Sequence, residues 1–187
     1  MCSGACFRVG RGRLRQSYDL LGRFLEGASA TIMSTQEGHK RRVLTFDRID
    51  QVMPEVHRLV PAHETVGNWS LGAICKHLDD SFTGSIEGFD LRNHRIKRFF
   101  MKRKMLQVAL TKGIPRNYTV DPNITPPPHV DLKAGVAGLA AAIERYMSYD
   151  GRLRAHPLFG RMPRETWDRL HCVHCAHHLS FAIPSDS

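Results

Sequence analysis

The sequence has no long hydrophobic run, and no apolar stretch approaches the ~20 residues that a membrane-spanning helix needs. No apolar segment of the kind found in secretion signals follows the N-terminus. The five cysteines are scattered and odd in number, which does not fit a disulfide framework. These absences predict a soluble protein without a membrane partner, located in the reducing cytoplasm.

Strand patterns are also lacking, because apolar and polar residues nowhere alternate for long. Apolar residues recur instead at the spacing of an amphipathic helix. The helices predicted from this pattern span approximately residues 45–61, 70–88, 96–112, 131–149 and 163–181. The 187 residues, 42% apolar and 24% charged, indicate one globular domain. Four main helices and one basic helix, without strands, predict that this domain is an all-α bundle.

Helix boundaries are indicated by capping residues and by prolines. The candidate N-caps are Thr45 or Asp47, Asn68 or Ser70, and Asp131. Pro54 should kink or restart the first helix, since proline cannot donate the backbone hydrogen bond of a helix interior. Between the third and fourth helices lies a long loop with the run Pro126-Pro127-Pro128, which we expect to be extended. Loops of this length often line a functional site.

Charge is unevenly distributed along the chain, which has 27 Lys and Arg against 18 Asp and Glu. Residues 1–42 are rich in Gly, Ser, Arg and Thr, and we expect a disordered extension there, followed by the bundle domain over 43–187. The stretch 92–116 is basic as well, and it forms either a solvated helix face or a surface that attracts anions. Few aromatic residues interrupt it, so nucleic acid is not an expected partner.

Histidines and cysteines concentrate near the C-terminus. On a helix with about 100° per residue, one apolar stripe contains Trp167, Leu170, His171, His174, His178 and Phe181. His177 lies beside this stripe, whereas Cys172 and Cys175 lie on the opposite flank. Buried imidazoles need partners, and a pair four residues apart on a helix can share a metal ion. The pairs His174 with His178, His171 with Cys175, and His171 with His174 all have suitable spacing, and the pattern does not choose among them.

Two further features of the metal-ligand candidates can be read from spacing. His77 lies at the edge of the apolar stripe of the second helix, where a histidine is more often a core-edge residue than a ligand. A zinc knuckle at Cys172-x-x-Cys175 is disfavoured, because a knuckle needs a turn between its cysteines and a second ligand pair. The alternative to any metal site is a group of core histidines that bond to helix neighbours.

Several segments resemble the DinB/YfiT-like superfamily over residues 43–184. Segment 67–78, GNWSLGAICKHL, resembles the second-helix motif of that superfamily, and 174–178, HCAHH, resembles the His-x-x-x-His motif of its last helix. Segments 156–160, HPLFG, and 176–181, AHHLSF, resemble more narrowly an uncharacterised DinB-like branch. The resemblance implies an up-down-down-up four-helix bundle, here with an extra basic helix and the Pro-rich loop. It also implies a divalent metal ion, zinc or nickel, held by His77, His174 and His178.

Three neutral imidazoles leave a divalent ion with an open position. With the resemblance, this implies a metal-dependent transferase or hydrolase of small molecules, with a low-molecular-weight thiol as a second cofactor. The alternative is a non-catalytic metal-binding or interaction module, associated with stress. A small-molecule substrate, anionic if the basic stretch attracts it, and a second copy of the chain in a homodimer are the candidate partners. Acid–base candidates are Glu64, Asp79, Asp80, His129 and His156, none of them favoured.

Overall fold

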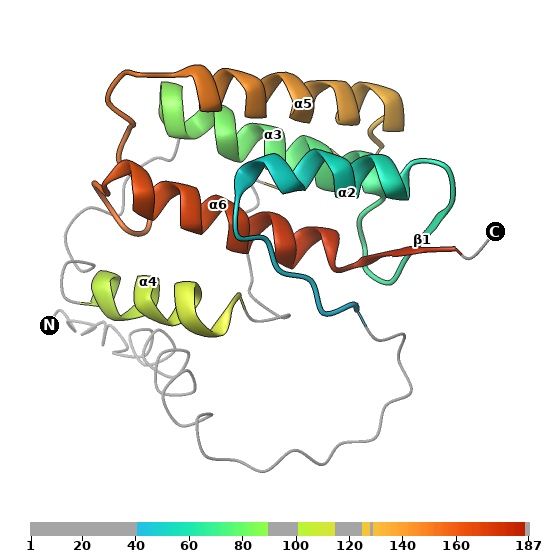
Figure 1. Ribbon diagram of the computed structural model, residues 1–187, viewed down its shortest axis with the longest axis horizontal. Helices are drawn as coiled ribbons and strands as arrows, with labels where there is room; N and C mark the ends of the chain where they lie inside the picture. Colours follow the sequence, from blue (N-terminus) through green and yellow to red (C-terminus); the bar gives the residue numbers. More distant parts are fainter. Residues whose placement is uncertain (1–40, 90–100, 115–124, 128, 186–187) are drawn as a thin grey trace, which may run out of the picture. The chain divides into compact units, whose positions relative to one another are not determined.

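The computed structural model describes residues 41–89, 101–114, 125–127 and 129–185 (Figure 1). The predicted N-terminal extension therefore lies outside the described residues, except for Arg41 and Arg42. Residues 92–100 and 115–116 of the basic stretch lie outside them as well, and so does most of the Pro-rich loop. No helix in the described part of the chain combines the length and the apolar character needed to cross a bilayer.

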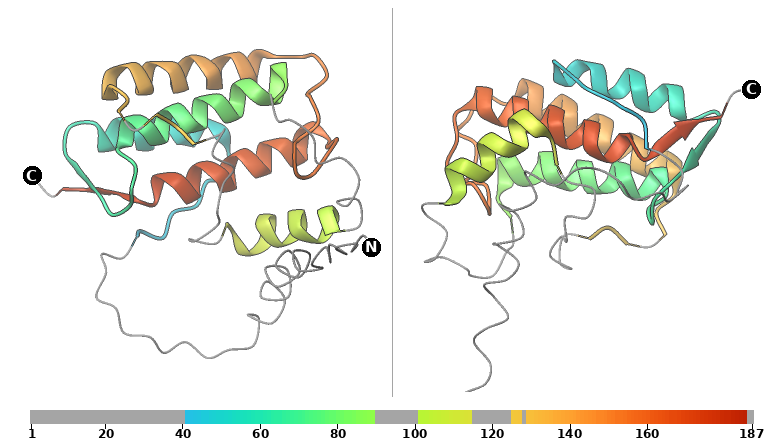
Figure 2. Two further views of the ribbon diagram at one scale, coloured as in Figure 1. Left: turned by 180° about the vertical axis from the view of Figure 1, so that it is seen from behind. Right: turned by 90° about the horizontal axis from the view of Figure 1, so that it is seen from below.

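The described residues are mostly helical, which confirms the predicted all-α fold. A 3-10 turn, η2 (Ile49–Gln51), leads into helix α2 (Val52–Leu59). The longer helices are α3 (Leu71–Glu87), α4 (Met101–Lys112), α5 (Leu132–Ser148) and α6 (Arg164–Leu179). Helices α3 and α5 lie side by side in every view, and α6 packs beside α3 (Figures 1 and 2).

Capping explains where α3 and α5 begin. The side chain of Ser70 accepts a hydrogen bond from the N–H of Ala73 at 3.2 Å, and Asp131 accepts one from Ala134 at 2.8 Å. Both caps confirm the sequence prediction, since a side-chain oxygen there satisfies an N–H that has no helical partner. Past the other end of α3, Gly88 has φ 110°, a backbone conformation that favours glycine.

The start of the first helical segment differs from the prediction. Neither Thr45 nor Asp47 caps it; Gln51 accepts the N–H of Asp47 at 2.8 Å and that of Arg48 at 3.1 Å. The structure shows a restart at Val52, so Pro54 lies in the first turn of α2. A proline there costs no hydrogen bond, because the first N–H groups of a helix have no carbonyl partner.

Two short strands correct the prediction that the chain has none. Strand β1 (His63–Thr65) pairs antiparallel with β2 (Ala182–Pro184), and His63 lies opposite Pro184. Segments of three residues are too short for an alternating pattern to be recognised in the sequence. The pair ties the chain after α6 to the connection between α2 and α3. The last helix therefore ends at Leu179, and Phe181 lies outside it.

Glycines allow α3 and α5 to approach closely. A Cβ placed on Gly135 would lie 2.6 Å from the carbonyl oxygen of Gly72, and one on Gly72 would lie 2.5 Å from that of Val130. Away from this close contact between α3 and α5, the core is built from large side chains of three helices, including Phe82, Tyr146 and Trp167. This packing fixes α3 as the rigid support of His77.

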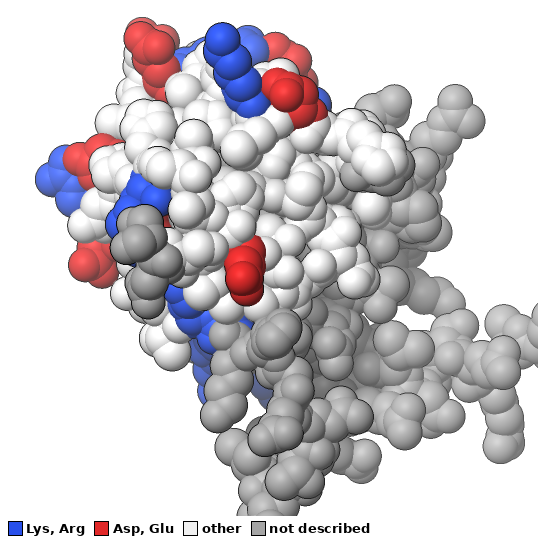
Figure 3. All heavy atoms as spheres, turned by 90° about the vertical axis from the view of Figure 1, so that its right-hand side faces the viewer, with Lys and Arg blue, Asp and Glu red and all other residues white. Residues whose placement is uncertain are grey.

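Charged side chains lie mainly along the edges of the face on which β1 and the C-terminus are found (Figure 3). Between these edges, most of the described residues visible on this face carry no charge. The described residues therefore form no continuous basic surface on this side of the molecule. Of the predicted anion-attracting stretch, 92–116, the structure describes residues 101–114, which include α4.

Candidate metal centre

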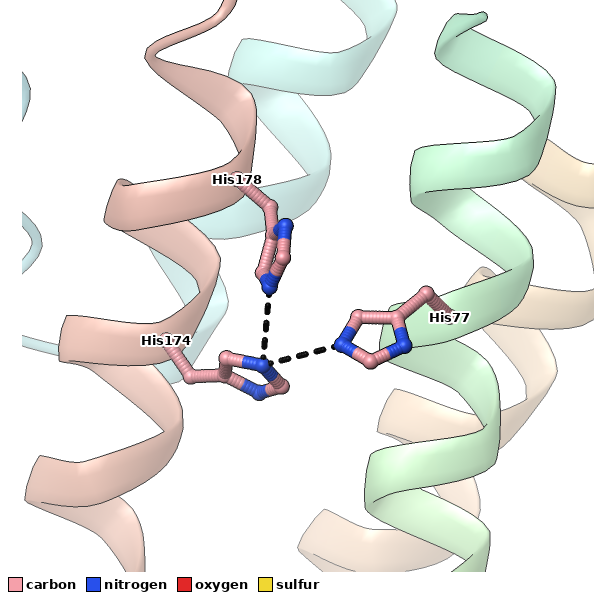
Figure 4. A group of neighbouring side chains, drawn as sticks. All are labelled: His77, His174 and His178. Atoms are coloured by element: carbon pink, nitrogen blue, oxygen red, sulfur yellow. Dashed lines mark hydrogen bonds between the residues drawn. The ribbon is translucent and has the colours of Figure 1, made fainter. Parts of the chain in front are cut away.

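Three histidines from two helices point toward one another in the interior. His77 projects from the middle of α3, and His174 and His178 project from successive turns of α6 (Figure 4). His77 and His178 are buried, and His174 is partly exposed. The spacing of four residues on α6 places two rings on one face, and the packing of α3 against α6 supplies the third.

The distances suit a common ligand ion. Nε2 of His174 lies 3.1 Å from Nε2 of His77 and 3.0 Å from Nε2 of His178. One ligand nitrogen from each ring can be chosen so that all three atoms lie within 4.8 Å of one another. Two nitrogens that are each ~2.1 Å from one ion stand roughly 3.0–3.4 Å apart for ligand angles between about 90° and 109°. The three side chains could therefore hold a metal ion.

Hydrogen bonds between the rings are a poorer explanation of the same geometry. A neutral imidazole nitrogen offers either one N–H or one lone pair in the ring plane. Nε2 of His174 faces two other Nε2 atoms, so it can form a well-directed hydrogen bond with only one of them. A cation at the point of convergence would accept a lone pair from all three nitrogens.

Burial keeps the rings of His174 and His178 unprotonated. Burial, reinforced by the neighbouring histidines, holds the pKa of His174 well below its ordinary range. Burial also lowers the pKa of His178, with further contributions from His77 and His177. Because a metal ligand must present an unprotonated nitrogen, a lowered pKa reduces competition by protons at neutral pH.

Trp69 covers one side of the cluster. Its ring stacks on that of His178, with centroids 5.3 Å apart and planes 10° from parallel, and it lies 5.0 Å from that of His77. The tryptophan immediately precedes the cap residue Ser70, so the start of α3 fixes its position. Nothing in the sequence pattern indicates this stacking, because it brings together residues from opposite ends of the domain.

The other two histidines of the C-terminal cluster, His171 and His177, are not among the converging rings. His171 is 1% exposed and stacks on Phe82 at a centroid distance of 4.0 Å, inside the core. Burial lowers the pKa of His171 to about 3, with smaller contributions from His156 and Arg164. His177 packs edge-on against His178 at 4.8 Å. Burial, the charge of Arg41 and His77 together lower the pKa of His177 to about 4.

The cysteines of α6 are buried although they lie on a flank of the helix away from the histidine stripe. Both are free thiols. Their burial follows from the position of α6, which contacts α2, α3 and α4 on different sides. Burial raises the pKa of Cys172 to about 11 and that of Cys75 to about 12. Thiols with such raised pKa values are poor nucleophiles and poor metal ligands. Neither a zinc knuckle at Cys172 and Cys175 nor a His171–Cys175 metal site forms among the described residues.

None of the five acid–base candidates is in the group of converging rings. Asp79 and Asp80 both pair with Lys76 on the surface of α3. His156 is a structural residue of its loop, because its Nδ1 accepts the N–H groups of Leu158 and Phe159 at 3.0 and 3.2 Å. Glu64 and His129 are exposed.

Comparison with known proteins places the chain in a family without assigning it an activity. Residues 38–185 match the sequence profile of DUF1569, described as a protein of unknown function. No curated protein and no solved structure shows significant similarity to the chain. The resemblance to the DinB/YfiT-like superfamily stays a prediction. Because the match covers well over half of the sequence and includes all three histidines, the chain belongs to the DUF1569 family.

Proposed function

We propose that this protein binds one divalent metal ion, zinc or nickel, through His77, His174 and His178, within a DinB-like bundle. The observation that carries this proposal is the convergence of three Nε2 atoms, with His174 at 3.0 and 3.1 Å from the other two. Imidazole nitrogens suit both metals. Three protein ligands leave coordination positions open, which is typical of catalytic rather than structural sites.

The reaction proposed for this site is transfer or hydrolysis of a small molecule. A divalent ion in such a site acts as a Lewis acid and lowers the pKa of a water or thiol ligand. The protein's own thiols at Cys75, Cys172 and Cys175 are buried with raised pKa values, so none of them is suited to act as nucleophile. A nucleophilic thiol would therefore be a separate low-molecular-weight molecule.

Metal binding is tested by elemental analysis of protein purified without a histidine tag. We expect close to one zinc or nickel ion per chain in the wild type and a large loss in His174→Ala. The matched control is His57→Ala, because His57 is an exposed histidine on α2, which supplies none of the converging rings. Equal metal content in the wild type and His174→Ala would refute the proposal.

Catalysis is tested separately, because a metal site can also serve a non-catalytic module. Metal-loaded wild type is incubated with a small thiol and an electrophile, and thiol consumption is followed against His174→Ala. Consumption that depends on the intact site supports a transferase. If metal binds but no thiol or ester substrate turns over faster than with His174→Ala, the non-catalytic alternative is favoured.

A further inference from the structure

Arg41 is anchored next to the proposed metal site by a residue that is not itself a ligand. Its Nη1 lies 3.1 Å from Nδ1 of His177, a contact between residues 136 positions apart. The ring of His177 in turn packs against His178, with centroids 4.8 Å apart. A single ring therefore separates the guanidinium of Arg41 from a proposed metal ligand.

The orientation of His177 follows from the chemistry of its partner. A guanidinium can donate hydrogen bonds but cannot accept them, so Nδ1 of His177 must be the acceptor. The ring proton then lies on Nε2, and His177 also forms a hydrogen bond with the backbone of Ile114. These two contacts hold the imidazole between the end of α4 and Arg41.

The charge of Arg41 has no acidic partner among the described residues. The adjacent Arg42 is different: it pairs with Glu55 and donates to the carbonyl oxygens of Leu179 and Ala182. Arg42 therefore fastens the chain to the end of α6. Arg41 donates one hydrogen bond to a neutral ring, which leaves most of its N–H donors available for another acceptor.

The surroundings of Arg41 are aromatic. Its guanidinium carbon lies 5.5 Å from the centroid of the Phe181 ring, and that ring packs against His177 at 5.5 Å. Phe181 also closes over Gly67, at 3.4 Å from the position of a Cβ there. A partly buried cation between aromatic rings attracts an anion more strongly than a solvated one, because fewer waters screen the charge.

We propose that Arg41 binds the oxyanion of a small-molecule substrate, and that His177 is the positioning residue that holds Arg41 beside the metal site. The substrate class is a small molecule with a carboxylate or phosphate group. This inference rests on the proposed metal site. Arg41 would serve the reaction by placing the bound anion next to the open coordination positions of the metal ion. Arginine suits the role, since its planar fork pairs with oxyanions through two parallel hydrogen bonds.

The test uses full-length protein loaded with cobalt, whose content is measured before any titration. Benzoate and inorganic phosphate are the anionic probes, and benzamide is the uncharged analogue of benzoate. Calorimetric titrations at low ionic strength compare the wild type with Arg41→Gln. Arg145→Gln is the matched control, because it removes the same charge from an exposed residue that pairs with Glu87 instead.

We expect Arg41→Gln to keep its cobalt and to bind at least one of the two anions about tenfold more weakly, which equals about 1.4 kcal/mol. Benzamide binding should not change, and Arg145→Gln should match the wild type. A similar tenfold loss in His177→Phe, which keeps an aromatic ring but offers no acceptor to Arg41, would support the positioning role. If His177→Phe binds both anions as the wild type does, that role is wrong.

The outcomes separate this inference from the metal site itself. If the wild type holds cobalt but both anions bind Arg41→Gln within threefold of the wild type, the inference is overturned and the metal site stands. It is likewise overturned if the cobalt-loaded wild type binds neither anion, or if Arg145→Gln loses as much affinity. A wild type that retains none of zinc, nickel or cobalt refutes the metal site instead, and with it the inference that rests on that site. Should Arg41→Gln not fold, Arg41→Lys replaces it; the loss of the planar fork should weaken anion binding at least threefold.

Discussion

Replacing His171 by phenylalanine should make the stability of the protein less sensitive to acid. His171 is 1% exposed and stacks on Phe82 at 4.0 Å and on Trp167 at 5.2 Å, so phenylalanine preserves its ring contacts. Its Nε2 has no hydrogen-bond partner among the described residues. Because phenylalanine removes this buried polar atom, we expect stability at pH 7.5 to be equal or higher.

The pH effect follows from the difference in pKa between the folded and unfolded chains. Burial lowers the pKa of His171 from 6.5 to about 3. Below pH 6.5 the unfolded chain therefore takes up a proton that the folded chain does not, and stability falls until the pH approaches the folded value. Each pH unit in this window costs about 1.4 kcal/mol, so His171 alone accounts for roughly 2 kcal/mol between pH 7.5 and 5.0.

Urea unfolding at pH 7.5 and pH 5.0, with a chelator present to remove metal, measures this effect. The wild type should lose about 2 kcal/mol more than His171→Phe over the interval. His57→Ala, at an exposed site on α2, should lose as much as the wild type. If His171→Phe loses the same free energy as the wild type, His171 does not have a depressed pKa in the folded protein, and the reasoning fails.

Two further changes test the packing and the cover of the site. Gly135→Ala should destabilise the protein by about 1–3 kcal/mol in urea unfolding, because its Cβ would lie 2.6 Å from the carbonyl of Gly72. Gly138→Ala is the control: its Cβ would meet only a side-chain oxygen at 3.1 Å, so a comparable loss there would contradict the argument. Trp69→Ala should weaken metal affinity by about 10–100-fold in a chelator competition, because the ring stacks on His178. An unchanged affinity would show that Trp69 does not orient the ligand.

Local patterns are sufficient for the helices that carry the proposed site. The spacing of apolar residues locates α3, α5 and α6, and the side-chain oxygens of Ser70 and Asp131 mark two of their first turns. The interval of four residues between His174 and His178 is enough to place both rings on one face. These features depend on neighbours within a few turns, so the sequence alone can determine them.

Features that depend on contacts between residues far apart in the sequence cannot be predicted from local sequence patterns. Spacing leaves His77 as a core-edge histidine, and only the resemblance to a family selects it as a ligand. The burial of Cys172 and Cys175 does not follow from the sequence, because periodicity cannot tell that α6 has neighbours on several sides. The strands β1 and β2 are not predicted, because an alternation of apolar and polar residues cannot be recognised in segments of three residues.

The sequence by itself determined which residues form helices and which side chains share a helix face. Only the tertiary structure brought Nε2 of His77 to 3.1 Å from that of His174, across 97 positions, and placed Arg41 against His177, across 136. The physical reason is that helix formation is governed by hydrogen bonds and side chains a few residues apart. The meeting of distant residues depends on how whole helices pack, through contacts such as the glycine-mediated approach of α5 to α3.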